Sequence, residues 1–158
     1  MTIGTASVNN LLTFYRYVTL IPLAVFALYD ARYHKVRNCA LLCFLPWSLA
    51  SIPLMLTTEP FPWSWIILKS ISGFITGGGI LFLASYFTDG GIGGGDIKLA
   101  AILGILYGGS TICFILGAAS LLLLIYWLSK TITGGSKKMH ISFVPFLFTA
   151  VLLITLIN

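Results

Sequence analysis

Charged residues are scarce in this sequence. Of its 158 residues, 8% are charged and only four are acidic, whereas an average soluble domain carries about 25% charged residues. Hydrophobic residues make up 58% of the chain. This balance excludes an ordinary soluble domain and predicts an integral membrane protein. Once the hydrophobic runs are set aside no soluble domain remains, so we expect residues 1–158 to form a single transmembrane domain.

Residues that could form disulfides or bind metals are also few. The three cysteines, Cys39, Cys43 and Cys113, lie in hydrophobic runs and form no C-x-x-C pair, so neither a disulfide framework nor a zinc site is indicated. His34 and His140 lie beside basic residues and have no third ligand in the sequence. We therefore expect no metal site and no cofactor.

Basic residues exceed acidic ones and give a net charge of +5. They form no stripe interleaved with aromatic residues, so we expect no nucleic-acid partner. Most lie in short loops between hydrophobic runs, where they indicate topology. The loops that contain them belong on one side, which makes these loops cytoplasmic and places both termini outside. The residues concerned are Arg32, Lys35, Arg37, Lys98, Lys130, Lys137 and Lys138.

The hydrophobic runs predict about six transmembrane helices, in an all-α polytopic membrane protein. The fourth run is short, and Gly108-Gly109 interrupts it. Either its helix continues through these glycines or the preceding loop lies recessed in the membrane. Pro46 and Pro53 predict a kink in the second helix. The six expected spans are residues 11–29, 39–56, 63–87, 96–107, 112–128 and 141–157.

Four glycines make one face of the third expected span nearly flat. Gly73, Gly77, Gly78 and Gly79 recur at helical spacing, and small residues in this pattern allow another helix to approach closely. Packing within the bundle is the favoured interpretation. Docking of a substrate helix on the same face is the alternative.

A glycine-rich loop contains the most unusual acidic residue of the chain. Asp96 follows Gly93, Gly94 and Gly95 and opens a hydrophobic run, and an ionisable residue at such a boundary is costly to place without a function. Glycines there would let a substrate backbone come close to the acid. As a structural alternative, Asp96 is simply a first-turn helix acid, with Lys98 as a boundary anchor.

Asp30 closes the first expected span on the same predicted membrane face as Asp96, which suggests a pair of carboxyl groups. Two such groups at close range cannot both ionise easily, so one keeps a proton and the other can act as a base toward water. The helix dipole would leave the proton on Asp30, at a helix C-terminus, and ionise Asp96, at an N-terminus. Taken alone, Asp30 could equally be a solvated loop acid. We interpret Asp89 as a solvated turn residue that could help to hold a basic substrate.

Three segments resemble the type IV prepilin peptidases, membrane aspartic proteases of the Gly-x-Gly-Asp type. The specific segment is Gly93-Gly94-Gly95-Asp96-Ile97-Lys98-Leu99. The run from Asp30 to Asn38 is similar to the first-aspartate loop of that family, and residues 141–147 are similar to its last span, which contains Pro-Phe. The resemblance covers nearly the whole chain.

This resemblance implies a single transmembrane peptidase domain in the bacterial cytoplasmic (inner) membrane. Asp30 and Asp96 would be the catalytic pair, and the loop of Gly93, Gly94 and Gly95 would admit the substrate backbone. The partners would be membrane lipid and the helices of prepilin or pseudopilin substrates, whose basic leader is removed on the cytoplasmic side. No metal or cofactor is implied.

The sequence departs from the family pattern in two places. Arg37 precedes Asn38, where the family often has proline. Longer relatives also have an N-terminal extension with paired cysteines and methylate the new amino terminus. Because neither extension nor cysteine pairs are present, the expectation is the short, peptidase-only form.

Two other classes of function remain open from the residues alone. A small proton-coupled transporter or channel could use Asp96 and Lys98 as a gated ion pair at a broken helix, although acids are lacking within the spans. A non-catalytic assembly subunit would tolerate replacement of both aspartates by asparagine.

Overall fold

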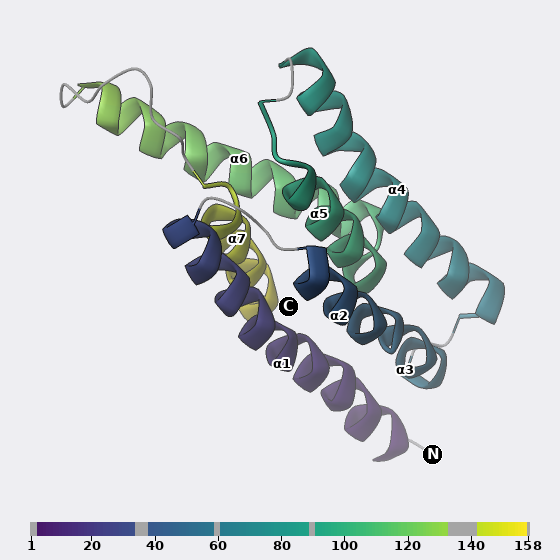
Figure 1. Cartoon of the computed structure of the whole chain (residues 1–158). Helices are drawn as coiled ribbons and strands as arrows, with labels where there is room; N and C mark the ends of the chain where they lie inside the picture. The colour runs from purple at the N-terminus through teal and green to yellow at the C-terminus, as the bar shows by residue number, and fades with distance from the viewer. Residues whose placement is uncertain (1–2, 34–37, 59–60, 89–90, 133–141, 158) are drawn as a thin grey trace.

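The computed structural model describes residues 3–33, 38–58, 61–88, 91–132 and 142–157. In these ranges all regular secondary structure is helical, which confirms the all-α expectation (Figure 1). The helices are α1 (Ile3–Tyr33), α2 (Asn38–Leu49), α3 (Ser51–Thr58), α4 (Trp63–Phe87), α5 (Gly94–Tyr107), α6 (Gly109–Ile132) and α7 (Val144–Ile157).

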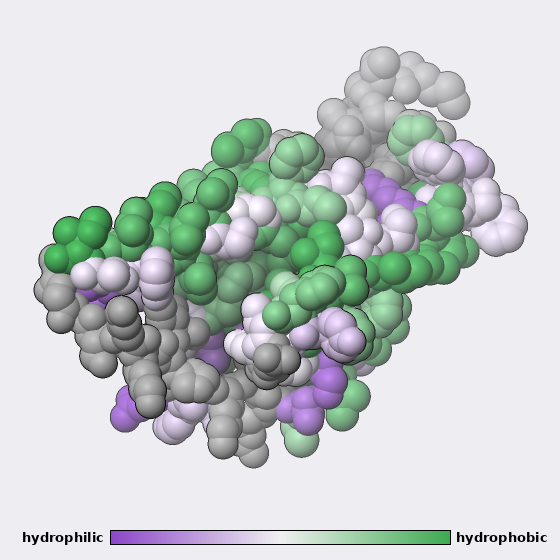
Figure 2. Space-filling model, turned by 90° about the horizontal axis from the view of Figure 1, so that it is seen from above, coloured by the Kyte–Doolittle hydropathy of each residue, from purple (hydrophilic) through white to green (hydrophobic). Residues whose placement is uncertain are grey.

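Four segments of the described chain are long and apolar enough to cross a membrane. They are Leu11–Tyr33, Asn38–Thr57, Trp63–Phe87 and Gly109–Ile132, and α7 is a shorter apolar helix. Large hydrophobic side chains such as Leu28 and Phe82 are exposed, and hydrophobic residues cover much of the face seen in Figure 2. An exposed apolar surface of this kind is stable in contact with lipid, so the chain is a polytopic membrane protein.

The helix bounds follow most of the expected spans. α4 has the expected bounds, whereas α1 extends beyond its expected span at both ends. The second expected span is confirmed as one candidate membrane-crossing segment, Asn38–Thr57, and the expected kink lies where α2 ends at Leu49 and α3 begins at Ser51. Pro53 has no N–H to donate to the carbonyl of Leu49, so a continuous helix would lose a hydrogen bond there.

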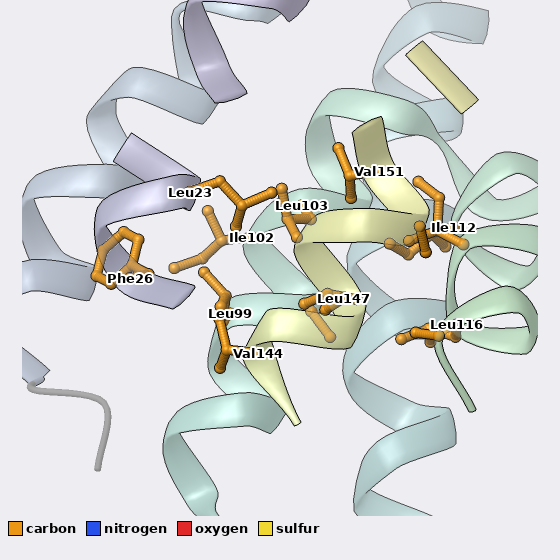
Figure 3. Packing of buried hydrophobic residues seen from close by; sticks show 14 of the residues in the cluster. Leu23, Phe26, Leu99, Ile102, Leu103, Ile112, Leu116, Val144, Leu147 and Val151 are labelled. Atoms are coloured by element: carbon orange, nitrogen blue, oxygen red, sulfur yellow. The ribbon is translucent and has the colours of Figure 1, made fainter. Parts of the chain in front are cut away.

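Helix α5 occupies the centre of the bundle. Every residue from Leu99 to Tyr107 is buried, and the main hydrophobic cluster joins α5 to α1, α2, α4, α6 and α7. Figure 3 shows Leu99, Ile102 and Leu103 among the side chains of this cluster. The helix does not continue through the glycines after Tyr107, because Gly108 ends it with a φ of 79°.

Glycines bring α4 and α5 into backbone contact. A Cβ atom added to Gly73 would overlap the carbonyl oxygen of Gly104, and one added to Gly104 would overlap the carbonyl oxygen of Gly73. One added to Gly77 would overlap the carbonyl oxygen of Ala100. Packing within the bundle is therefore confirmed for Gly73 and Gly77, and Gly77 is not available for substrate docking. Gly79, in contrast, has nothing within 4 Å of its Cβ position.

Candidate active site

Asp30 is fixed where the end of α1 meets the beginning of α7. The last carbonyls of a helix and its first N–H groups have no partner within the helix. Here the two ends satisfy each other: the Ser142 hydroxyl donates to the Asp30 carbonyl at 2.9 Å, and the Val144 N–H donates to Asp30 Oδ2 at 3.3 Å. Asp30 is only 4% exposed. It is therefore a buried, oriented acid and not a solvated loop residue.

Asp96 lies in the first turn of α5, next to an open glycine loop. Gly93 is the N-cap residue, and its carbonyl accepts a hydrogen bond of 3.0 Å from the Asp96 N–H. Gly93 and Gly94 are exposed, whereas Gly95 and Asp96 are half-buried. A Cβ atom on Gly94 would meet nothing within 4 Å. The loop before Asp96 thus leaves space for an approaching backbone.

The fold brings these two acids to one place although they lie far apart along the chain. Asp96 stands outside the four candidate membrane spans. Burial, and then repulsion from Asp30, raise the pKa of Asp96 from its ordinary value of 3.8 to about 6. Burial alone raises the pKa of a carboxyl group, and the contribution of Asp30 shows that the charge of this second carboxylate also acts on Asp96. This effect of Asp30 on Asp96 supports the predicted pairing of the two acids, which stays a prediction.

Groups from other helices act on each acid against the effect of its own helix dipole. Asp30 closes α1, but the Val144 N–H at the start of α7 donates to its carboxylate, and an N–H donor stabilises the ionised form. Asp96 begins a helix, but burial and Asp30 raise its pKa. The proton assignment made from the helix dipole therefore stays a prediction.

Lys98 contacts a different helix. Its ammonium donates to Asn38 Oδ1 on α2 at 3.1 Å, so it connects α5 to α2 at the end where both helices begin. Several residues named from the sequence lie outside the described residues. They are His34, Lys35, Arg37, Asp89, Lys137, Lys138 and His140. In the part of the chain that is described, no three His, Cys, Asp or Glu residues cluster as metal ligands.

A family model described as the type IV leader peptidase family matches residues 17–128. The chain belongs to this family. The matched region contains both aspartates, the glycine loop and Lys98. A curated relative, the prepilin leader peptidase/N-methyltransferase of Bacillus subtilis (strain 168), is 28% identical over 124 residues. The match covers 78% of this chain but 47% of that relative, so the chain spans about half its length. No solved structure matches the chain.

Two groups at the site escaped the interpretation of the sequence. Ser142 and the Val144 N–H hold Asp30, although residues 141–147 were linked to the family only through their Pro-Phe pattern. A serine just before a hydrophobic run is a common helix-start residue. That signal indicates a cap, but it does not identify the end of α1 as the partner.

Proposed function

We propose that this chain is an aspartic endopeptidase that removes the basic leader from prepilin-like or pseudopilin precursors. Asp30 and Asp96 are the catalytic residues. The observation that carries the proposal is the electrostatic effect of Asp30, at the end of α1, on Asp96, at the start of α5. Membership of the type IV leader peptidase family supports it.

The proposed reaction uses the pair with a single shared proton. The ionised carboxylate of Asp30, stabilised by the Val144 N–H, accepts a proton from a water molecule, whose oxygen attacks the scissile carbonyl carbon. Protonated Asp96 donates to the carbonyl oxygen, which forms a tetrahedral intermediate. As this intermediate collapses, the C–N bond breaks and the proton held by Asp30 passes to the leaving amine, while one hydroxyl of the intermediate returns its proton to Asp96 as the new carboxyl group forms. The pair titrates as a unit, and no metal or cofactor enters the proposal.

The glycine loop is proposed to admit the substrate backbone beside Asp96. Gly93 and Gly94 are exposed, and Gly94 has free space where a side chain would be. An extended peptide can pass close to a backbone that has no Cβ atoms. Gly93, Gly94 and Gly95 are therefore proposed as substrate-contacting residues.

The proposed location is the bacterial cytoplasmic membrane, with the active site on its cytoplasmic face. The aspartates lie at the end of α1 that is followed by a basic segment and at the beginning of α5 near Lys98, and basic residues favour the cytoplasmic side. The relative from Bacillus subtilis is named as a prepilin leader peptidase. Substrates of that class are proposed here as well.

Co-expression with a candidate prepilin tests the function directly. Wild type should remove the leader, whereas Asp30→Asn and Asp96→Asn at equal protein levels should each lose at least about 1,000-fold of the rate, because the pair acts as a unit. Glu59→Gln is the control: Glu59 lies between the second and third expected spans, and the predicted topology puts that loop on the membrane face opposite the basic loops. Loss of activity in only one aspartate variant would contradict the pair.

The transporter alternative receives less support. It requires Asp96 and Lys98 to form a gated ion pair, but the Lys98 ammonium donates to Asn38. Asp96 is instead influenced by Asp30. These contacts favour a carboxyl pair over a carboxylate–ammonium gate.

A further inference from the structure

A groove of about 660 Å³ runs along the bundle surface between α2, α4 and α5. Its lining is almost entirely apolar, and its two polar residues, Asn38 and Lys98, stand at the end where α2 and α5 begin. The residues that carry the following argument are Asn38, Leu42, Gly79, Phe82, Ile97 and Lys98.

The shape of the groove fits a helix. Along α2 the lining runs from Asn38 to Leu45, about 10 Å or two helical turns at about 1.5 Å per residue. On α4 the lining includes Gly79, which has no atom within 4 Å of its Cβ position. Small residues beside exposed apolar ones form the surfaces that membrane helices pack against.

The polar end of the groove adjoins the first turn of α5, which contains Asp96. Ile97 and Lys98 line the groove and directly follow Asp96, but Leu99 and Leu103 on the other side of α5 are buried in the core. A chain that leaves the groove at this end must cross the first turn of α5 to reach Asp96. Gly93 and Gly94, which are exposed, leave room for that crossing.

We infer that this groove holds the apolar helix of the substrate while its scissile segment crosses the glycine loop to the aspartates. The inference rests on the proposed function. Lys98 is a cation at the rim of the apolar groove, so it repels a basic leader and admits the uncharged helix. This complementarity sets which part of the substrate enters the groove. Cleavage then takes place next to the start of the helix.

Filling the groove tests the inference. Gly79→Leu places a side chain in the groove, and Gly117→Leu is the matched control, because Gly117 is an exposed glycine on α6 with nothing within 4 Å of its Cβ position. Gly79→Leu should cleave the full-length precursor about tenfold more slowly, with a higher KM, since the lost contact contributes to substrate binding. Gly117→Leu should match wild type, and both variants should melt like wild type.

A second substrate separates this inference from the proposed function. A soluble peptide with the leader and cleavage site, but without the apolar helix, should be cut equally by wild type and Gly79→Leu. If wild type cuts the precursor and Gly79→Leu cuts it equally well, the groove is filled by lipid alone and the inference is overturned, while the function stands. If the aspartate variants retain activity, the proposed function fails instead.

Cross-linking locates the substrate helix independently. Leu42 lines this groove, whereas the adjacent Cys43 lines a separate groove of about 340 Å³ between α1 and α2. In an inactive Asp96→Asn protein without native cysteines, Leu42→Cys should form a disulfide with a cysteine in the substrate helix. A protein that retains only Cys43 should not. Cross-linking at position 43, or at neither position, would overturn the inference.

Discussion

The two halves of α5 have opposite surroundings. From Leu99 to Tyr107 every residue is buried, and Gly104 touches the backbone of α4. From Gly94 to Lys98 the residues are exposed or half-buried, and the space around Gly94 is open. We call Leu99 to Tyr107 the closed half of α5, because packing surrounds these residues, and Gly94 to Lys98 the open half, because these residues are accessible.

This difference shows how an open glycine loop can precede a well-placed acid. The closed half has no freedom to shift against α4, because backbone meets backbone there. It therefore fixes the first turn of the same helix, and with it Asp96. The open half leaves the surroundings of Asp96 accessible to a peptide. Rigidity and access are supplied by successive turns of one helix.

The largest expected effect comes from a change in the closed half. Gly104→Ala adds a methyl group that overlaps the Gly73 carbonyl, so α4 and α5 must separate. We expect a loss of about 3 kcal/mol in stability and little accumulated protein. Gly94→Ala, the matched change in the open half, should accumulate and melt like wild type because its Cβ position is free. Equal melting temperatures of the two variants in detergent would contradict the comparison.

A smaller effect is expected at Ser142, through which the segment before α7 holds Asp30. Ser142→Ala removes the hydroxyl that donates to the Asp30 carbonyl at 2.9 Å. Loss of one such hydrogen bond is worth about 1 kcal/mol, so we expect kcat to fall about fivefold to tenfold with KM unchanged. Ser142→Thr retains the hydroxyl and should restore kcat. A rise in KM, or no recovery with threonine, would show that Ser142 does not position Asp30.

The sequence predicted the features that depend on local pattern. Hydrophobic runs gave the bounds of α4, and the basic loops put Asp30 and Asp96 on one predicted membrane face, in agreement with the effect of Asp30 on the pKa of Asp96. Gly77 and Gly79 show the limit of this approach. They are the same residue two positions apart, about 200° around the helix, so one is packed against Ala100 and the other is open. Only the position of α5 distinguishes them.

The electrostatics of the site could not be predicted, because they depend on distant segments. Ser142 is 112 residues from Asp30, and the N–H that stabilises the Asp30 carboxylate belongs to Val144. An argument from each aspartate's own helix therefore misses the groups that act on its carboxyl from other helices. The backbone of α7 opposes the dipole at the end of α1 by supplying an N–H donor there.

The smallest expected effect is a pH dependence of cleavage, caused by the ionisation of Asp96 in the open half. Because the pKa of Asp96 is raised to about 6, a rise in pH through this value removes the proton that the pair needs. We expect kcat to fall about fivefold between pH 6 and about pH 7, as a single ionisation requires. Glu59→Gln should have the same profile. A rate that is constant or rising across this interval would exclude Asp96 as the proton carrier.

The same pKa shift predicts a change in stability with a definite sign. The folded state holds the Asp96 proton more tightly than the unfolded chain, and this difference contributes to the stability of the fold. The contribution is fully present below pH 3.8, the ordinary pKa of the group, and is lost as pH rises through about 6. Asp96→Asn cannot ionise, and its melting temperature should decline less than that of wild type over this interval. Parallel declines would mean that the surroundings of Asp96 are more hydrated than its half-buried position implies, and the open half of α5 would then have no special electrostatic role.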